Sequence, residues 1–367
     1  MLRNANRTGS IVFEPDRNKY KAFCALPSGR RISKRFDTPA AAQEWLTTTY
    51  ASIIKHSFVE PSSLTVGAWL VSYLKDYKAQ TVAPKTIDLY TLLAGKCEPI
   101  SGIKLQSVTA QTIQSFYTEL QDTQSVEMVR KVHRFLHSAF AKARQIGLLS
   151  VNVVSAAEPP KRTDKKDIET FSPDEVAAIY DAAKKYSKGR YYPFIMLAFA
   201  SGARLGELLG LCWDCVDFDA DEITLKRNLT DTLSAGLQLS TPKTKAGIRT
   251  ISIPPTVMAL LKDMKRTSGV VTMRSYVFIT ANGTPFLPRN FQRIWSNIVK
   301  LSGIKHKNFH VIRHTHASEL LAAGAPIADV SRRLGHAKIS HTLDLYGHAI
   351  PRMDKILSQK VSSIFSI

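Results

Sequence analysis

The sequence predicts a multidomain protein: a small β-sheet with one helix, then an all-α domain, then a mainly α (α+β) domain. Three observations predict this order. The chain has 367 residues, more than one ordinary core holds. Strand-like alternation gives way to helical periodicity after a break at 59–65, "VEPSSLT". A Pro-rich, charged stretch at 156–170 has no apolar period, which is typical of an interdomain linker.

The N-terminal region, assigned to 1–58, contains three short runs of alternating residues separated by Asp-Arg-Asn and Pro-Ser-Gly turn signals. Each run predicts a strand. A helix follows, with Thr38 as its N-cap and Pro39 at its first position. The predicted strands lie within 9–16, 19–29 and 30–38.

Basic side chains crowd this small predicted sheet. Lysine is common on solubilised edge strands, but so many charges of one sign favour contact with DNA. The candidate DNA-binding residues are Arg17, Lys19, Lys21, Arg30, Arg31, Lys34 and Arg35.

The second region, assigned to 64–155, is predicted to be all-helical, because apolar residues recur at helical spacing from Val66 to about Val154. Its last long helix has basic residues at polar positions, where they can reach DNA phosphates. These candidates are Arg130, Lys131, Arg134 and Lys142.

The third region, assigned to 169–350, begins with a capping box formed by Ser172 and Glu175 around Pro173. An apolar helix then ends at Gly202. Short strands and further helices follow, and apolar residues at helical spacing continue into a tail, 351–367. The strands are predicted at 222–227, 248–254 and 275–280.

The net charge of +20 and the pI of about 9.8 indicate a polyanionic partner, most simply nucleic acid. A membrane surface is less favoured, because no basic amphipathic anchor stands out. The chain has no apolar run of about 18 residues and no signal-peptide pattern, so we expect a cytoplasmic protein with four reduced cysteines.

Common catalytic and metal signatures are not supported. There is no Walker phosphate loop. Cys212 and Cys215 form a C-x-x-C pair, but no second pair exists and the stretch is apolar. His310 and His314 share a predicted helix face that His316 does not, and the glutamate of a metalloprotease helix is missing. We therefore expect no metal and no cofactor.

Histidines gather near the C-terminus around one tyrosine, Tyr346, on a stretch that looks helical and partly exposed: seven of the ten lie between His306 and His348. Two arginines belong with them. Arg313 follows His310 by three residues, and Arg204 is followed one turn later by Glu207, which can brace it. Buried arginines need an anion. Two arginines, histidines and one tyrosine therefore suit a single phosphate.

Four motifs in order then resemble the tyrosine recombinases: "ASGARLGEL", "HVIRHTHAS", "LGH" and a tyrosine ten residues later. The match covers the third region. The layout of the first two regions resembles the integrases of temperate phages and conjugative transposons, of the lambda-integrase type. The resemblance implies a site-specific recombinase that cleaves and rejoins DNA through a 3′-phosphotyrosine.

The resemblance also implies roles for individual residues. Arg204 and Arg313 would clamp the scissile phosphate, His310 and His336 would hydrogen-bond it or move protons, and Tyr346 would be the nucleophile. The "LGH" motif would set His336 beside Tyr346. The family also uses a lysine on a hairpin. Lys243 fits that position better than Lys245, although the choice between them stays open.

The implied partners are double-stranded DNA at core and arm sites, the arm site being read by 1–58, and copies of the same chain in a tetramer on DNA. The tail, 351–367, would dock on a neighbouring protomer. A host DNA-bending protein and a directionality factor are further implied partners, in a prokaryotic cytoplasm near the nucleoid. Two alternatives share the charge or the chemistry: a type IB topoisomerase-like enzyme and a catalytically inactive DNA-binding protein.

Overall fold

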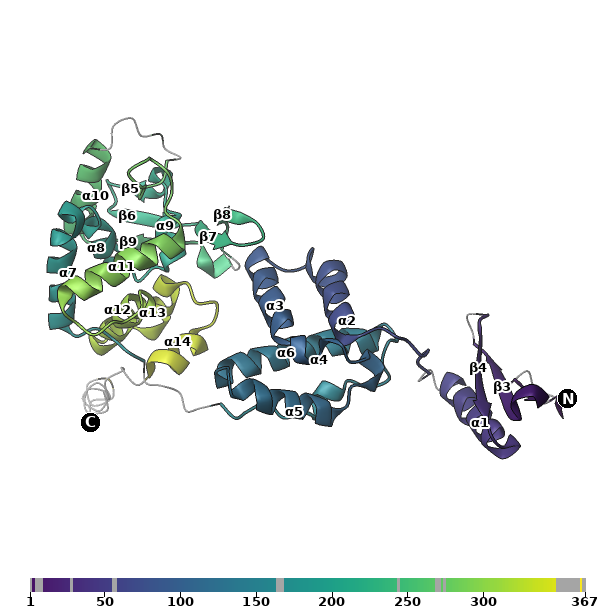
Figure 1. Cartoon of the computed structure of the whole chain (residues 1–367). Helices are drawn as coiled ribbons and strands as arrows, with labels where there is room; N and C mark the ends of the chain where they lie inside the picture. Colours follow the sequence, from purple (N-terminus) through teal and green to yellow (C-terminus); the bar gives the residue numbers. More distant parts are fainter. Residues whose placement is uncertain are drawn as a thin grey trace. The chain divides into compact units, whose positions relative to one another are not determined.

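The computed structural model of the chain describes residues 2–3, 9–26, 29–54, 58–162, 168–242, 245–267, 272, 275–347 and 364. They belong to two units, 1–163 and 164–367, which we describe one at a time (Figure 1). Within the described residues, no helix is both long and apolar enough to cross a membrane. The finer division into three domains and a tail stays a prediction.

An antiparallel sheet with one helix begins the first unit. Among the described residues its strand order is β1-β2-β3-β4, and Ala22, Cys24, Ala42 and Leu46 are buried between the sheet and α1. The three predicted strands and the helix are confirmed, and the Thr38 hydroxyl accepts from the Ala41 amide at 3.3 Å. The fourth strand, β1, is only two residues long and therefore carries no alternation to detect. The elements are β1 (Leu2–Arg3), β2 (Ser10–Glu14), β3 (Lys19–Ala25), β4 (Arg31–Phe36) and α1 (Pro39–Ile54).

The rest of the first unit is helical, as predicted. Its core is built on aromatic side chains, with Trp69, Tyr73, Tyr117 and Phe140 almost fully buried. The indole nitrogen of Trp69 donates to the carbonyl of Ala139 at 3.1 Å, so the first helix is fixed to the last. The helices are α2 (Val66–Ser72), α3 (Pro84–Lys96), α4 (Glu98–Ser101), α5 (Ala110–Gln121) and α6 (Val126–Gln145).

Helices surround small sheets in the second unit. The predicted capping box is present: the Ser172 hydroxyl accepts from the Glu175 amide at 3.2 Å, and Glu175 accepts from the Ser172 amide at 2.9 Å. The core includes Phe194, Trp213 and Trp295, all almost fully buried. The helices are α7 (Pro173–Lys185), α8 (Tyr192–Ser201), α9 (Leu205–Leu209), α10 (Pro255–Thr267), α11 (Pro288–Ser302), α12 (His310–Ala322), α13 (Ile327–Leu334) and α14 (Ile339–Tyr346).

The strands of this unit differ in part from the prediction. The runs at 222–227 and 248–254 contain β6 and β9, but the run at 275–280 is wrong: it makes only isolated bridges at Tyr276 and Ile279. The hairpin β7–β8 was not predicted, because its sequence is rich in Thr, Ser and Gly. Among the described residues, the sheet has the order β5-β6-β9. The strands are β5 (Val216–Asp217), β6 (Glu222–Leu225), β7 (Asn228–Thr232), β8 (Gly236–Ser240) and β9 (Arg249–Ser252).

Candidate active site

Arg204 lies where the chain leaves α8 and enters α9. Gly202 ends α8 with a φ of 61°, and a Cβ there would be 2.4 Å from the His316 ring, so only glycine fits. The Arg204 side chain is 41% exposed, and its Nη1 donates to Oε1 of Glu207 at 2.9 Å. The bracing by Glu207 that the spacing predicted is therefore present, and the guanidinium stays open to an incoming anion.

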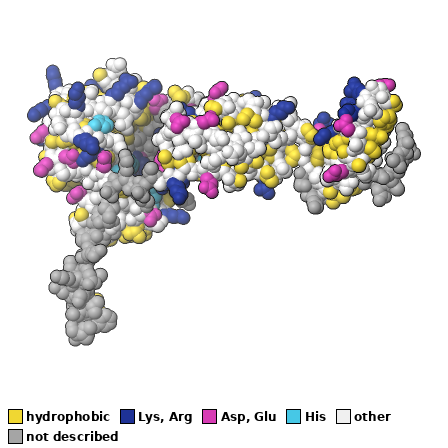
Figure 2. Space-filling model, turned by 60° about the horizontal axis from the view of Figure 1, so that its bottom comes forward, with side chains coloured by type: hydrophobic (Ala, Val, Ile, Leu, Met, Phe, Trp, Pro, Cys, Tyr) yellow, Lys and Arg dark blue, Asp and Glu magenta, His cyan; other side chains and the backbone are white. Residues whose placement is uncertain are grey.

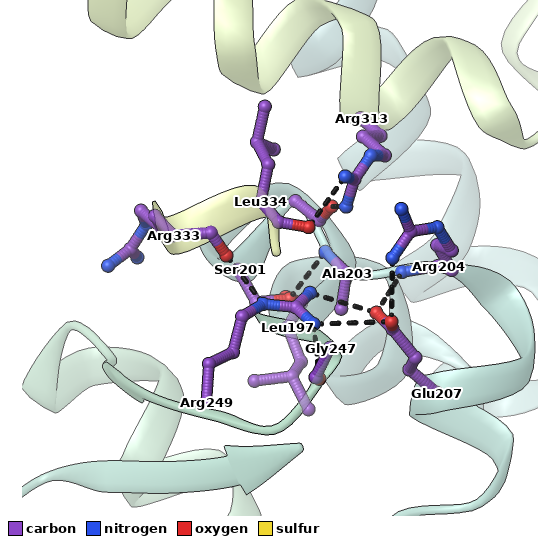
Figure 3. Close-up of polar contacts among 11 residues, drawn as sticks. Leu197, Ser201, Ala203, Arg204, Glu207, Gly247, Arg249, Arg313, Arg333 and Leu334 are labelled. Atoms are coloured by element: carbon purple, nitrogen blue, oxygen red, sulfur yellow. Dashed lines mark hydrogen bonds and ion pairs between the residues drawn. The ribbon is translucent and has the colours of Figure 1, made fainter. Parts of the chain in front are cut away.

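Arg249 is a site residue that was not predicted from the sequence. It begins β9, its side chain is 5% exposed, and it donates to both carboxylate oxygens of Glu207 (Figure 3). Its Nε also donates to the Arg333 carbonyl at 2.6 Å. A signal was available: strand alternation puts Arg249 on the inward side with the buried Ile251, and a buried arginine requires a carboxylate.

Arg313 ties together two loops that carry other site residues. It lies in the first turn of α12 and is 2% exposed. Its Nη1 donates to the Gly202 carbonyl at 3.0 Å and its Nη2 to the Leu334 carbonyl at 2.6 Å (Figure 3). Gly202 precedes Arg204 by two residues, and Leu334 precedes His336 by two. Arg313 therefore fixes the backbone beside both.

The site carries more positive than negative charge. Burial would raise the pKa of Glu207, but the hydrogen bonds and charge of Arg249, together with the backbone hydrogen bond and charge of Arg204, outweigh it and hold that pKa below its usual 4.5. Glu207 thus stays ionised and compensates one of three guanidinium charges. Arg313 is held by neutral carbonyls, and burial, with Arg204 nearby, lowers its pKa to about 9. The excess of positive charge suits a phosphate.

Tyr346 is the last residue of α14 and is only 1% exposed. The stretch around it is helical and partly exposed, as predicted, but Tyr346 itself packs with Ala317, Leu321 and Leu334. Burial raises the pKa of Tyr346, while the nearby guanidiniums of Arg313 and Arg204 act in the opposite direction. The structure thus brings the tyrosine within electrostatic reach of both arginines.

The partner of the Tyr346 hydroxyl is His314, whose Nδ1 lies 2.7 Å from it. The resemblance implied that His336 lies beside Tyr346, and no role was predicted for His314. His310 and His314 lie four positions apart on α12, and their rings meet edge to face at 4.7 Å. The spacing had placed both on one face, but the meeting of α12 with α14 is a tertiary contact that no local motif encodes.

His336 lies after α13 on a loop that requires glycine. Gly335 has a φ of 69°, and a Cβ there would be 2.8 Å from Nη1 of Arg249. The His336 Nδ1 lies 2.8 Å from the hydroxyl of buried Thr342. Burial, then Arg313 and His341, lower the pKa of His336 to about 3. It is therefore neutral at pH 7 and can present Nε2 to a ligand.

The other histidines of the cluster divide as the spacing predicted. His310 lies at the exposed start of α12, and desolvation, then His314 and Arg313, lower its pKa. His316 points elsewhere, with its Nδ1 2.8 Å from the Phe199 carbonyl and its Nε2 accepting from Arg333. The residues that the structure describes hold no group of three His, Cys, Asp or Glu arranged for a metal ion.

The hairpin lysine lies outside the described part of the chain. Lys243 is not described, and for Lys245 only the backbone is, at the start of a short 3-10 helix. The choice between the two therefore stays a prediction.

The basic residues of the N-terminal module do not share one face. In Figure 2, dark-blue side chains gather at one edge of this module. The strand registers put Lys19, Lys21, Arg31 and Arg35 on the face away from α1, and Lys34 on the α1 side with Ile32 and Phe36. Glu14 pairs with Lys21 and Arg35. Arg17 and Arg30 are exposed just outside the strands.

The four basic candidates of α6 also differ. Lys131 and Arg134 are exposed. The Arg130 Nη1 donates to the Pro160 carbonyl at 2.8 Å, so it anchors the start of the linker. Lys142 lies 4.7 Å from the centre of the Tyr77 ring and bonds Gln145. Of these four residues, Lys131 and Arg134 are therefore the two whose charges stay available to a DNA phosphate.

Comparison with known sequences places the second unit in one family. The model of the phage integrase family matches residues 169–352. The XerC-like tyrosine recombinase of Caldanaerobacter subterraneus is 30% identical over 74% of this chain and 75% of its own length. The ICEBs1 integrase of Bacillus subtilis is 26% identical over 71% of this chain and 72% of its own.

Solved structures share the fold. The Tn1549 transposon integrase, solved with a circular-intermediate DNA, superposes with a TM-score of 0.71 at 19% identity, over 81% of this chain and 99% of that one. A lambda integrase dimer bound to a core site gives a TM-score of 0.60 at 19% identity, over 94% and 95% of the two chains. At this identity the likeness concerns the fold.

Proposed function

The chain belongs to the phage integrase family of tyrosine recombinases, and we propose that Tyr346 is the nucleophile with which it cleaves DNA. Family membership makes the protein a site-specific recombinase, an enzyme that cuts and rejoins DNA strands. In the proposed reaction the Tyr346 oxygen attacks the scissile phosphorus and leaves a 3′-phosphotyrosine and a free 5′-hydroxyl. The ester keeps the bond energy, so rejoining needs no ATP.

The observation that carries this proposal is the electrostatic position of Tyr346. Its side chain is buried in the second unit, where the charges of Arg204 and Arg313 both act on it. An attacked phosphate gains negative charge in the transition state, and guanidiniums with donors to spare stabilise that charge. Arg204 supplies an exposed guanidinium, and Arg313 a buried one that its contacts hold in place.

The histidines and the lysine complete the proposed chemistry. His336, neutral and oriented by Thr342, donates to a phosphate oxygen, and His310 does so from the exposed start of α12. The departing 5′-oxygen takes a proton from the hairpin lysine, Lys243 or Lys245. No step in this scheme requires a metal or a cofactor.

We propose double-stranded DNA as the substrate and a tetramer on DNA as the working assembly. The lambda integrase has been solved as a tetramer on a Holliday junction, and strand exchange joins four strands. The helical region, 64–155, would bind the core site and the N-terminal module, 1–58, the arm site. The net charge of +20 agrees with such contacts. We also propose a host DNA-bending protein and a directionality factor as partners. The proposed location is a prokaryotic cytoplasm.

The tail, 351–367, lies outside the described residues apart from the exposed Ile364. We keep the proposal that it docks on a neighbouring protomer and couples cleavage to assembly. Deletion of 356–367 should then impair strand exchange between two sites while single-site cleavage continues. Loss of both activities together with unfolding would instead indicate that the tail packs against the catalytic domain of the same chain.

The test uses DNA sites recovered from the protein itself. DNA that stays covalently attached to the full-length chain is sequenced, and the site is built into a nicked substrate that traps the adduct. We expect the wild-type chain to form an adduct on Tyr346, and we expect EDTA to have no effect on its formation. Tyr346→Phe should form no adduct but should still bind DNA. Adduct formation by Tyr346→Phe would refute the assignment.

The same substrates separate the two alternatives. A catalytically inactive DNA-binding protein gives no adduct with the wild-type chain. A type IB topoisomerase-like enzyme gives an adduct and relaxes supercoils, but does not exchange strands between two sites. Strand exchange by the wild-type chain excludes both.

A further inference from the structure

The hydroxyl of Tyr346 and the ring of His314 form a pair that the proposed function does not yet use. Nδ1 of His314 lies 2.7 Å from the hydroxyl oxygen, and the ring centres are 5.6 Å apart. Tyr346 is almost fully buried, whereas His314 is only partly buried. This contact joins α12 to α14, which are 32 residues apart at these two positions.

We propose that His314 is a catalytic residue, the proton acceptor that activates Tyr346. The inference rests on the proposed function, because it takes Tyr346 as the nucleophile. The resemblance implied that His310 and His336 hydrogen-bond the phosphate or move protons. The inference assigns the proton transfer from Tyr346 to His314, and His310 and His336 then only hydrogen-bond the phosphate.

The geometry selects His314 among the neighbouring groups. It is the histidine whose hydrogen bond reaches the Tyr346 oxygen, whereas the Nδ1 of His336 is bonded to Thr342 and that of His316 faces the Phe199 carbonyl. A general base must lie within about 2.6–3.2 Å of the proton that it takes. His310 packs edge to face on the His314 ring and fixes its plane.

The charges around His314 keep it ready to accept a proton. The groups that face it are His310 and Arg313 on its own helix and Tyr346 on α14. Burial, then Arg313, lower the pKa of His314 below 6.5. The ring is therefore neutral at pH 7, and the proposal takes its Nε2–H tautomer, in which Nδ1 accepts a hydrogen bond from the Tyr346 hydroxyl.

The proton balance of the step is complete. As the Tyr346 oxygen bonds to phosphorus, its proton passes to Nδ1 of His314, which becomes an imidazolium. The bond from phosphorus to the 5′-oxygen breaks, and that oxygen takes a proton from the hairpin lysine. In the reverse step the 5′-hydroxyl attacks and gives its proton back to the neutral hairpin lysine, the phenol oxygen leaves, and His314 returns its proton to that oxygen.

Proton transfer is favourable only once the reaction is under way. A free phenol has a pKa of about 10 and does not give its proton to a neutral imidazole. The oxygen becomes far more acidic as it bonds to phosphorus, so the acceptor acts in the transition state. A plainer role also exists: a buried hydroxyl needs some hydrogen-bond partner. The two roles differ in whether the partner must accept a proton.

The experiment separates the roles with two substitutions in the full-length chain. His314→Asn keeps a polar partner that cannot take a proton, and His314→Ala leaves space beside a partly exposed site for added imidazole. The control is His306→Asn, at an exposed residue that is hydrogen-bonded to Ser296 and has no role in the proposed reaction. The probe is the nicked substrate, and the rate of adduct formation is measured from pH 5 to 9.

We expect both His314 variants to form adduct about 10²–10⁴-fold more slowly than wild type. His314→Asn should keep a thermal stability close to wild type, because it keeps a polar partner for the buried hydroxyl. Imidazole should restore His314→Ala in proportion to its neutral fraction. The wild-type rate should fall at acid pH as His314 is protonated, and this fall should disappear in the variants. The His306→Asn variant should match wild type.

A substrate with sulfur in place of the 5′-oxygen adds a second readout, because a thiolate leaves without a proton. His314 variants should stay slow on it. Three results would each overturn the inference while leaving Tyr346 as the nucleophile. They are recovery of the His314 variants on the sulfur substrate, a fall in rate at acid pH that persists in those variants, and a wild-type rate for His314→Asn. If the wild-type adduct is absent or maps elsewhere than Tyr346, the proposed function fails first and the inference with it.

Discussion

Arg249 and Glu207 form a two-point ion pair inside the second unit, with Nη1–Oε1 at 3.2 Å and Nη2–Oε2 at 2.9 Å. Their side chains are 5% and 4% exposed. Because Glu207 also holds Arg204, the buried pair sets the direction of an exposed guanidinium. Arg249 reaches the carboxylate from β9, and its other donors bind the carbonyls of Arg333 and Gly247.

Removing the carboxylate should therefore destabilise the fold. Glu207→Ala leaves the buried Arg249 charge without a partner, which typically costs about 3–5 kcal/mol of unfolding free energy. Urea unfolding measures it. The double variant Glu207→Leu with Arg249→Met should lose less than the sum of the two single changes, because it removes the unpaired charge. A loss below about 0.5 kcal/mol for Glu207→Ala would contradict this account.

The two proposed phosphate-binding arginines should respond differently to alanine. Arg204→Ala removes a half-exposed donor, so we expect near-normal stability and adduct formation about two to three powers of ten slower. Arg313→Ala should slow the reaction as well and also lower the melting temperature, because the carbonyls of Gly202 and Leu334 lose their donor. Equal melting temperatures for the two variants would show that Arg313 has no structural role.

The hairpin lysine can be identified by its leaving-group chemistry. If Lys243 protonates the 5′-oxygen, Lys243→Ala should slow adduct formation on the normal substrate. The same variant should approach the wild-type rate on the substrate with a 5′-sulfur, because a thiolate needs no acid. Lys245→Ala is the matched control two residues away. Recovery in Lys245→Ala instead of Lys243→Ala would transfer the assignment to Lys245.

The N-terminal module should bind DNA with the sheet face that points away from α1. Arg31 and Lys34 are both exposed on β4, but on opposite faces. We expect Arg31→Ala to weaken arm-site binding and to reduce the salt dependence of log K by about one unit, while Lys34→Ala has little effect. A fragment that begins at residue 64 should cleave a core site and lose the arm-site footprint. An unchanged footprint would refute the assignment of 1–58.

Stability should fall in mildly acid solution because histidines are buried neutral. Burial, then Arg333, lower the pKa of His316 to about 4, and the pKa of His336 is lowered to about 3. Between pH 6.5 and about 4 the unfolded chain therefore binds more protons than the native one. Stability is full above pH 6.5 and is lost below it, by about 1.4 kcal/mol per pH unit for each extra proton.

Calorimetry of the DNA-free chain at pH 7.5 and 5.0 checks this, in a range where carboxylates such as Glu207 still keep their charge. His316→Gln should flatten the dependence, because the unfolded chain then has one histidine fewer to take up a proton below pH 6.5. His306→Gln, at the surface, should leave the slope as it is. A melting temperature that does not change between the two pH values would exclude buried neutral histidines.

The sequence by itself determined the features that depend on a few neighbouring residues. The capping box of Ser172 and Glu175, the end of α8 at Gly202 and the bracing of Arg204 by Glu207 are all within one or two turns. Local backbone preferences and side-chain reach decide such features. The ordered motifs around Arg204, Arg313 and Tyr346 likewise sufficed to indicate the family, because each is short and fixed in spacing.

Only the tertiary structure decided which distant groups meet. It pairs Arg249 with Glu207 across 42 residues and His314 with Tyr346 across 32. It also buries a tyrosine that its own helix would leave partly exposed, and it leaves 275–280 without a continuous strand partner. Hydrogen-bond partners over such separations are chosen by the packing of α12 against α14 and of α13 against β9, and packing depends on the whole core rather than on any one segment.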